Sequence, residues 1–289
     1  MAVPEARIAG RVLLVTGALF AAWVAAVWPP PIWWRDHEPR CTAMMRQRSD
    51  CRPVGQSDGR VANRVSSPVL ERMVIIAEDS RFKTHHGIDF VELREAWAAG
   101  SHRGASTITQ QLAKNMYLSP SRSVLRKIKE AVTAVRLELA LPKERIMELY
   151  LSVAEWGPGV WGARAASSSY FGVAPDRLSN AQAAALAATL PHPRTSNPAY
   201  RPERMLARRN LILARYYDGK TPVPHINEDT IPEIPEIEPP ILPPILDTVV
   251  IPDTTQDHPD SGGPVDSTQN PAVRLWPSSA GPRFSVYKP

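Results

Sequence analysis

The pattern of apolar positions is densest near the N-terminus, where the stretch from Val12 to Trp34 contains no charged residue. A helix of this length, at about 1.5 Å per residue, can cross the hydrocarbon core of a bilayer. Arg7 and Arg11 precede the stretch, and basic residues favour the cytoplasmic side of a membrane. A cleaved signal peptide would have a shorter apolar region and a small-x-small cleavage site, whereas this stretch is bulky and runs into consecutive prolines. We therefore expect an uncleaved anchor at residues 12–34 after a cytoplasmic segment at 1–11. The aromatic residues expected at the outer interface are Trp28, Trp33 and Trp34.

Apolar residues between positions 67 and 220 recur at helical spacing, without a run of alternating strands. Ser67 and Pro68 are typical of a helix start, and Ser179 with Gln182 forms a candidate capping box. We interpret EWGPGVWG, from Glu155 to Gly162, as a Gly-rich loop. The sequence thus predicts one mainly α domain at residues 67–220. Its expected helices cover about residues 68–79, 90–99, 109–116, 123–141, 143–153, 164–171, 180–190 and 202–217.

The segments on either side of this domain differ from it in composition. Residues 35–66 are polar and Arg-rich, as in a connector that follows a membrane anchor. Residues 221–289 hold half of the chain's 30 prolines, and they carry ten Asp or Glu against three Lys or Arg. Repeats such as IPEIPEIEPPILPPI favour an extended polyproline-type tail. A spacer across a cell-envelope layer, a docking segment for a partner and disorder without a role all fit this tail.

The charge balance points to an anionic partner of the domain. The whole chain has a net charge of +5 and the tail about −7, so the remainder carries about +12. Phosphate groups and acidic lipid headgroups fit this balance better than nucleic acid, because no zinc-finger, RNP or basic-zipper pattern is present. Cys41 and Cys51 lack the further ligands that a metal site needs. A local disulfide is slightly favoured over two free thiols if this region lies outside the cytoplasm.

The most unusual composition lies between Gly104 and Glu130, where small hydroxyl residues and amides are followed by cations. Side chains that only donate hydrogen bonds are suited to holding phosphate, although a solvated, salt-bridged helix face has a similar pattern. Glu130 within this stretch and Glu78 upstream could divide the work of a glycosyl transfer. His85 and His86 are adjacent, and neighbouring residues rarely converge on one metal ion. The cations of this stretch are Lys114, Arg122, Arg126, Lys127 and Lys129.

Five ordered motifs resemble those of the peptidoglycan glycosyltransferases. EDSRFKTHHGID, which begins at Glu78, is similar to the first family motif, E-D-x-x-F-x-x-H-x-G. GASTITQQLAKN, RKIKE, KERIMELYLSVAEWGPGVWG and AAALAATLPHP resemble the second to fifth motifs, and together they cover Ser67 to Tyr217. No S-x-x-K motif is followed by a domain of transpeptidase size. The chain therefore resembles the monofunctional biosynthetic peptidoglycan transglycosylases of glycosyltransferase family 51.

This resemblance implies a fold and a reaction. The fold would be a lysozyme-like α-helical lobe with a smaller membrane-associated lobe that includes residues 90–99 and Trp97. Glu78 would be the general base for the 4-hydroxyl of lipid II, which attacks the lipid-linked end of the growing glycan strand. Inversion would give a β-1,4 bond and release polyprenyl diphosphate. Glu130 would be the second acid, and Lys114, Arg122 and Lys129, supported by Arg126 and Lys127, would stabilise the leaving group. The remaining candidate substrate-binding residues are Asp79, Phe82, His85, Gly87, Ser106, Thr107, Gln110, Gln111 and Asn115, of which Asp79, Phe82 and Gly87 could instead serve the turn alone.

The same resemblance implies a cellular location, partners and cofactors for the enzyme. We expect a single-pass protein of the bacterial inner membrane with an extracytoplasmic catalytic domain. Its expected partners are lipid II, the growing glycan strand, the membrane and other proteins of cell-wall synthesis or division, and not nucleic acid. No cofactor is expected to be required, although a divalent cation, Mg²⁺ or Mn²⁺, could assist at the diphosphate.

Three features depart from the family pattern: Gly104-Ala105 in place of Gly-Gly, Ser152 in place of the usual Asn, and the Pro-rich tail. Ser152 could satisfy only part of what an Asn side chain satisfies. A lysozyme-like hydrolase is one alternative function, but it would not need so many cations between Gly104 and Glu130. A non-catalytic membrane scaffold is another, but both acids and the Gln110-Gln111 pair are intact.

Overall fold

The computed structural model describes residues 3–48, 51, 67–98, 106–121, 123–224 and 226. Most of the predicted connector, Gly104-Ala105, Arg122 and the tail beyond residue 226 lie outside the described residues. Within the described part, the regular structure is helical apart from one short hairpin, as the mainly α prediction requires. The helices are α1 (Val3–Ala25), α2 (Ala43–Gln47), α3 (Pro68–Glu78), α4 (Phe90–Ala98), α5 (Ile108–Tyr117), α6 (Val124–Ala140), α7 (Lys143–Val153), α8 (Ala163–Phe171), α9 (Asn180–Thr189) and α10 (Glu203–Asp218), with 3-10 turns η1 (Pro31–Arg35) and η2 (Pro175–Arg177).

Local capping signals set the helix starts, as the sequence predicted. The Ser67 hydroxyl accepts a hydrogen bond from the Leu70 amide at 3.4 Å, with Pro68 at the first helical position. Ser179 and Gln182 form a complete capping box at the start of α9. These caps fix the ends of α3 and α9, two helices that pack against each other.

The predicted Gly-rich loop is instead a hairpin, so that interpretation was wrong in part. Strand β1 (Glu155–Gly157) pairs antiparallel with β2 (Val160–Trp161), and Gly159 adopts φ +70° in the turn between them. A turn that needs positive φ favours glycine, which explains the composition that indicated a loop. The strands are too short to show the alternation by which a strand is recognised in a sequence.

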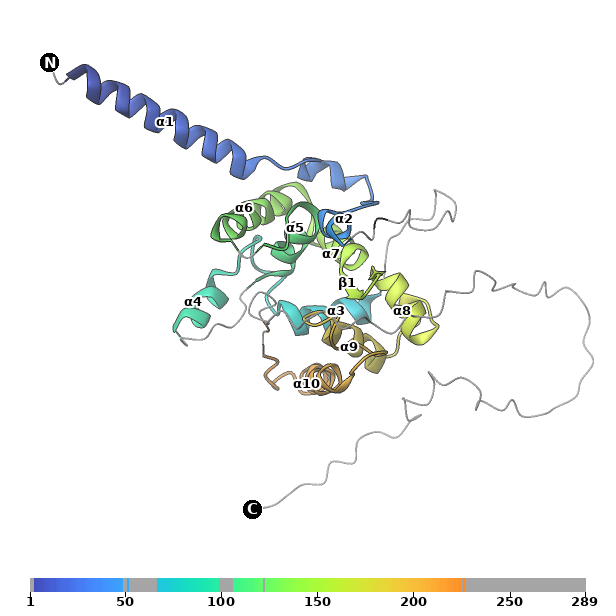
Figure 1. Cartoon of the computed structure of the whole chain (residues 1–289). Helices are drawn as coiled ribbons and strands as arrows, with labels where there is room; N and C mark the ends of the chain where they lie inside the picture. The colour runs from blue at the N-terminus through green and yellow to red at the C-terminus, as the bar shows by residue number, and fades with distance from the viewer. Residues whose placement is uncertain are drawn as a thin grey trace, which may run out of the picture. The chain divides into compact units, whose positions relative to one another are not determined.

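The helices pack in two neighbouring groups (Figure 1). Helix α9 contacts α3 and α10, and the alanines from Ala183 to Ala188 are buried, which allows the three helices to approach closely. In the second group, α5 packs against α6, α7 and α2 through side chains such as Leu112 and Leu137. The C-terminus of α3 lies between α10 of the first group and α5 of the second group. Glu78, the last residue of α3, therefore has contacts in both groups.

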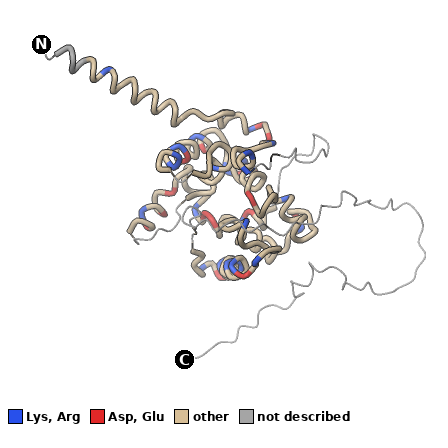
Figure 2. Tube along the Cα trace, viewed as in Figure 1, with Lys and Arg blue, Asp and Glu red and all other residues tan. Residues whose placement is uncertain are grey.

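The N-terminal helix differs from the predicted anchor in its limits. It begins before residue 12 and ends at Ala25, and the part from Ile8 to Ala25 is long and apolar enough to cross a membrane. Figure 2 shows most of α1 free of charged positions. The helix ends before the prolines at 29–31, which cannot donate the backbone bonds of a helix interior. One apolar helix near the N-terminus is therefore present, but it is shorter at its C-terminal end than the apolar stretch.

The residues after α1 contact the helical domain directly. Trp34, which we expected at the membrane interface, is instead buried, and its indole Nε1 donates to the Tyr117 hydroxyl at 2.6 Å. Burial raises the pKa of Tyr117 to about 12, so its hydroxyl stays neutral. Arg145 of α7 donates to the carbonyls of Trp34 and His37, each at 2.9 Å. Composition alone could not separate an interfacial tryptophan from one with a partner far along the chain.

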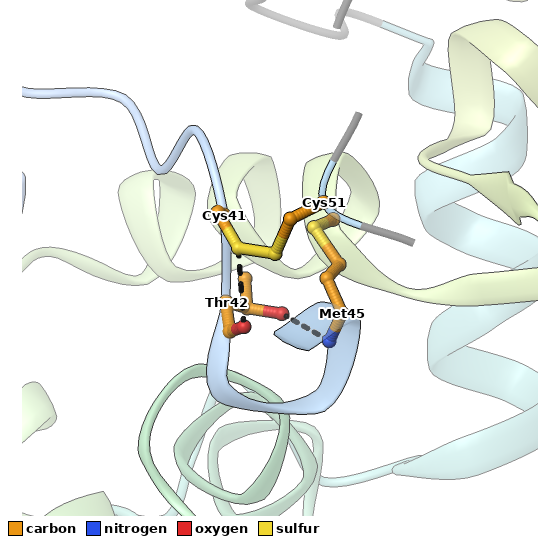
Figure 3. The surroundings of a disulfide bond; sticks show 4 residues. All are labelled: Cys41, Thr42, Met45 and Cys51. Carbon is orange, nitrogen blue, oxygen red and sulfur yellow. Dashed lines mark hydrogen bonds between the residues drawn. A yellow bond between two sulfur atoms is a disulfide. The ribbon is translucent and has the colours of Figure 1, made fainter. Parts of the chain in front are cut away.

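The structure joins Cys41 and Cys51 in a disulfide, with their Cα atoms 5.5 Å apart. The bond lies beside α2, where the Thr42 hydroxyl accepts from the Met45 amide at 3.2 Å (Figure 3). Gln47 at the end of α2 donates to the carbonyl of Leu118 after α5. The disulfide, which the sequence slightly favoured, therefore closes the short loop that contains α2, and Gln47 connects this loop to the domain.

Candidate active site

Glu78 is the last residue of α3, and its carboxylate is held by side chains from two other helices. It is 2% exposed, accepts from Gln111 Nε2 at 3.0 Å and pairs with Arg208 Nη2 at 3.2 Å. The Tyr150 hydroxyl donates to Gln111 Oε1 at 2.8 Å, which fixes the amide so that its NH₂ group faces the carboxylate. A buried carboxylate stays charged only with such partners. Glu78 is thus a positioned acceptor at the meeting point of α3, α5, α7 and α10.

Arg208 was missed by the sequence analysis. It lies on α10 and is 6% exposed, with buried Met205 and Ile212 on the same helix face. Besides Glu78, its Nη2 donates to the carbonyl of Ala77 at 2.7 Å. The sequence signal that could have identified Arg208 is its helical spacing with the apolar residues Met205 and Ile212, which predicts burial. A buried guanidinium requires an acidic partner, so this spacing would have indicated an ion pair.

Glu130 lies in a second cluster, on the buried face of α6. Glu130 is 1% exposed, and its carboxylate accepts from Arg126 Nη1 at 2.5 Å and from the Lys127 ammonium. Lys127 also donates to the Ser106 hydroxyl at 2.7 Å. These two cations stand one helical turn before the acid, which is the spacing at which α-helical side chains meet. With one carboxylate and two cations, the cluster keeps a net positive charge that suits an anionic group.

Asp79 follows the last residue of α3 and fixes the turn of the first motif. Both Asp79 oxygens contact His85 Nε2, at 3.0 and 2.9 Å, and Oδ2 also accepts from the Ile108 amide at 3.0 Å. That amide belongs to the N-terminus of α5, where a negative charge is favourable. Asp79 therefore joins the end of α3 to the start of α5 and holds Glu78 and Gln111 in register.

Asp79, His85 and Asp89 bring potential metal-ligand atoms within 4.8 Å of one another. Their oxygens already have donors, however: Asp89 Oδ1 accepts from two backbone amides at the start of α4, and Oδ2 accepts from Arg81 Nε at 2.7 Å. Although burial opposes ionisation, these bonds and the Arg81 charge lower the pKa of Asp89. The group fits a hydrogen-bond network better than a metal centre.

Four of the predicted substrate-binding residues have structural contacts in this turn or at the start of α5. Gly87 adopts φ +88°, and a Cβ there would lie 2.9 Å from the Val135 backbone nitrogen. The Thr107 hydroxyl donates to the Gly87 carbonyl at 2.6 Å, and Thr107 and Gln110 form the capping box of α5. Phe82 is buried with the Lys143 ammonium 4.4 Å from its ring centre. These contacts support the interpretation of Phe82 and Gly87 as turn residues.

The predicted leaving-group cations do not share one location. Arg126 and Lys127 meet at Glu130, whereas the Lys129 ammonium lies 4.7 Å from the ring centre of Trp23 on α1. Lys114 and Asn115 are half-buried near the end of α5, and Arg122 lies outside the described residues. The two residues that the family resemblance made supporting candidates, Arg126 and Lys127, thus contact the second acid directly.

Comparison with known proteins identifies the family of the domain that contains this site. The family model described as Transglycosylase matches residues 53–217, more than half of the chain. The chain belongs to the transglycosylase family. Both acids, and the helices that position them except for the last residue of α10, fall inside the matched range, as the resemblance of the five motifs predicted. The tail lies outside it.

Curated transglycosylases similar to this chain come from several bacteria. The biosynthetic peptidoglycan transglycosylase of Azoarcus sp. (strain BH72) is 40% identical over 223 residues, which cover 74% of this chain and 96% of that protein. Those of Bordetella avium (strain 197N) and Herminiimonas arsenicoxydans are 39% and 43% identical, over 72% and 66% of this chain and 92% and 87% of theirs. The similarity therefore extends over nearly the whole of these transglycosylases.

Ser152, the departure from the fourth family motif, has a local partner. Its hydroxyl donates to the Leu149 carbonyl of its own helix at 2.8 Å. Its backbone carbonyl packs against Gly162, where a Cβ would lie 2.7 Å away. The serine is satisfied within α7, as expected for a hydroxyl that can bond the preceding turn.

Proposed function

We propose that this transglycosylase polymerises lipid II into β-1,4 glycan strands. The acceptor's 4-hydroxyl oxygen bonds to the anomeric carbon of the lipid-linked strand, and the bond from that carbon to the diphosphate oxygen breaks with inversion. The hydroxyl proton passes to a carboxylate, and polyprenyl diphosphate leaves with the bonding electrons. The observation that carries this proposal is a buried Glu78, paired with Arg208, at the first motif of a Transglycosylase match.

Glu78 is the general base in this proposal. Gln111 and Arg208 each contact one of its carboxylate oxygens, so its orientation is set before substrate arrives. Tyr150 orients the Gln111 amide from behind. A base held in this way loses less entropy when the acceptor hydroxyl aligns, and pre-oriented groups contribute to catalysis for that reason.

Glu130 and its two cations stabilise the leaving group in this proposal. Negative charge grows on the diphosphate as the glycosidic oxygen departs, and fixed cations lower the energy of that transition state. Glu130 holds Arg126 and Lys127 in place, and Lys127 extends to Ser106. Since Glu130 already binds two cations, it does not offer a free carboxylate to a divalent metal. We therefore assign the charge neutralisation to the side chains.

The membrane arrangement is part of the same proposal. The apolar helix α1 anchors the chain, and the Cys41–Cys51 disulfide fits a domain on the oxidising, extracytoplasmic side of the bacterial inner membrane. Helix α4 exposes Phe90 and Trp97, at 71% and 85%, together with Leu93 on one face. An exposed apolar helix face is suited to the bilayer interface, where the lipid-linked substrate resides. Other proteins of cell-wall synthesis or division are the expected protein partners of this enzyme.

Polymerisation of labelled lipid II by the detergent-solubilised full chain tests this function. We expect glycan strands from the wild type and none from Glu78→Gln, which keeps the size of the side chain and one acceptor oxygen but cannot accept the proton. Glu71→Gln is the matched control, because Glu71 lies on the same helix away from the Gln111 and Arg208 contacts. Strands of normal length from Glu78→Gln would overturn the role of Glu78, and breakdown of finished glycan by the wild type would indicate a hydrolase instead.

A further inference from the structure

The chain reverses direction directly after α10. Gly219 adopts the left-handed conformation, and Asp218 Oδ1 accepts from the amides of Lys220 and Thr221 at 2.7 and 2.9 Å. The Thr221 hydroxyl donates to the other Asp218 oxygen. This turn directs the following residues back along α10, so that Pro224 reaches a residue 16 positions earlier in the chain.

That residue is Arg208, the partner of the proposed base. Its Nη1 donates to the Pro224 carbonyl at 2.6 Å, while its Nη2 donates to the Ala77 carbonyl and to Glu78. The guanidinium is buried, and its Nε has no hydrogen-bond partner. A planar group with acceptors at both ends has its tilt fixed by them, and a buried donor that loses its acceptor is costly. Without Pro224, Nη1 would join Nε as an unpaired donor.

We propose that residues 219–224, the strap, are a positioning element for catalysis: the strap holds Arg208 in the orientation that aligns Glu78. Arg208 and the strap act through Glu78, so this inference rests on the proposed role of Glu78 as the base. The Transglycosylase match ends at residue 217, just before the strap. The strap also continues into the Pro-rich tail. Displacement of the first residues of the tail, by tension or by a partner, would lower turnover without any change in the substrate-binding residues.

The test is made in the full chain by inserting Gly-Gly between Thr221 and Pro222, which moves Pro224 out of register with Arg208. The matched control carries the same insertion after Ile226. We expect the first insertion to lower kcat for lipid II polymerisation about tenfold, as for loss of one hydrogen bond to a charged group, with KM changed less than about twofold. We expect the control insertion to leave both constants unchanged.

A second background separates positioning from general damage. Arg208→Lys keeps the positive charge beside Glu78 but cannot bridge Pro224, Ala77 and Glu78 at once. If the strap acts through Arg208, the strap insertion should lower kcat no further in this background. An unchanged kcat in the otherwise wild-type chain, or an equal loss in both backgrounds, would overturn the proposal.

Hydrogen exchange of the peptide that contains Ala77 and Glu78 gives a readout that does not depend on activity. The strap insertion should speed exchange there, and the control insertion should not. If the wild type polymerises no lipid II, the proposed function fails, but this comparison still decides whether the strap holds the end of α3. Equal exchange in the two insertion variants would show that it does not.

Discussion

Gly87 provides a quantitative test of how the first motif is built. In Gly87→Ala the new Cβ would lie 2.9 Å from the Val135 nitrogen and 3.0 Å from the Ala134 carbonyl carbon, both backbone atoms of α6 that cannot rotate away. Placing a non-glycine residue at φ +88° costs about 2 kcal/mol, and forcing the helix aside costs about 2 kcal/mol more. A total of about 4 kcal/mol lowers the melting temperature of a domain of this size by roughly 8–16 °C.

Gly159→Ala is the matched control for this substitution. Gly159 has φ +70°, but a Cβ there meets nothing within 4 Å, so only the backbone strain of about 2 kcal/mol applies. Thermal unfolding of both variants, followed by circular dichroism in detergent, isolates the contact with α6. Gly87→Ala should melt roughly 4–8 °C below Gly159→Ala. Equal melting temperatures would refute the close approach of the turn to α6.

Three further predictions concern charges and the junction after α1. Burial raises the pKa of Glu71, so its ionised form opposes folding above that pKa; Glu71→Gln should raise the melting temperature at pH 7, and the gain should vanish once the pH falls below the ordinary value of 4.5. Hydrogen bonds from Thr221 and Lys220 lower the pKa of Asp218 from 3.8 to about 2. NMR titration should therefore find this carboxylate ionised at pH 3, and the turn should loosen only as the pH falls further. A titration at the ordinary pKa of 3.8 would contradict the turn. Arg145→Met removes the donors to the Trp34 and His37 carbonyls, and limited proteolysis should then cut near those residues faster than in the wild type, whereas an unchanged rate would show that the junction holds without Arg145.

Helices and their caps could be predicted because their signals are local. Ser67 and the Ser179–Gln182 pair lie next to the amides that they cap, and the apolar spacing of α3 to α10 follows the helical period. The hairpin from Glu155 to Trp161 escaped prediction because two or three residues cannot show a strand period. An element can therefore be predicted when the residues that define it lie close together in the sequence and are numerous enough to show its period.

The features that could not be predicted depend on contacts between residues that are distant in the sequence. Arg208 meets Glu78 across 130 positions, and Trp34 meets Tyr117 across 83, so neither partner could be assigned from spacing. Motif resemblance placed Glu78, Gln111 and Glu130 among the candidates, but it could not say which neighbours hold them. Lys129 stays a predicted leaving-group cation, and the contact of its ammonium with Trp23 of α1 is another one that motif resemblance could not supply.

The most direct test of the account counts both products of one reaction. Full-length protein in detergent is given lipid II, and released polyprenyl diphosphate is measured together with glycan-linked disaccharide in the wild type, Glu71→Gln and Glu78→Gln. We predict equal amounts of the two products from the wild type and Glu71→Gln, and neither product from a folded Glu78→Gln that still binds lipid II. Diphosphate release without glycan growth, or transfer by Glu78→Gln at the wild-type rate, would contradict a glycosyl transfer that depends on this carboxylate.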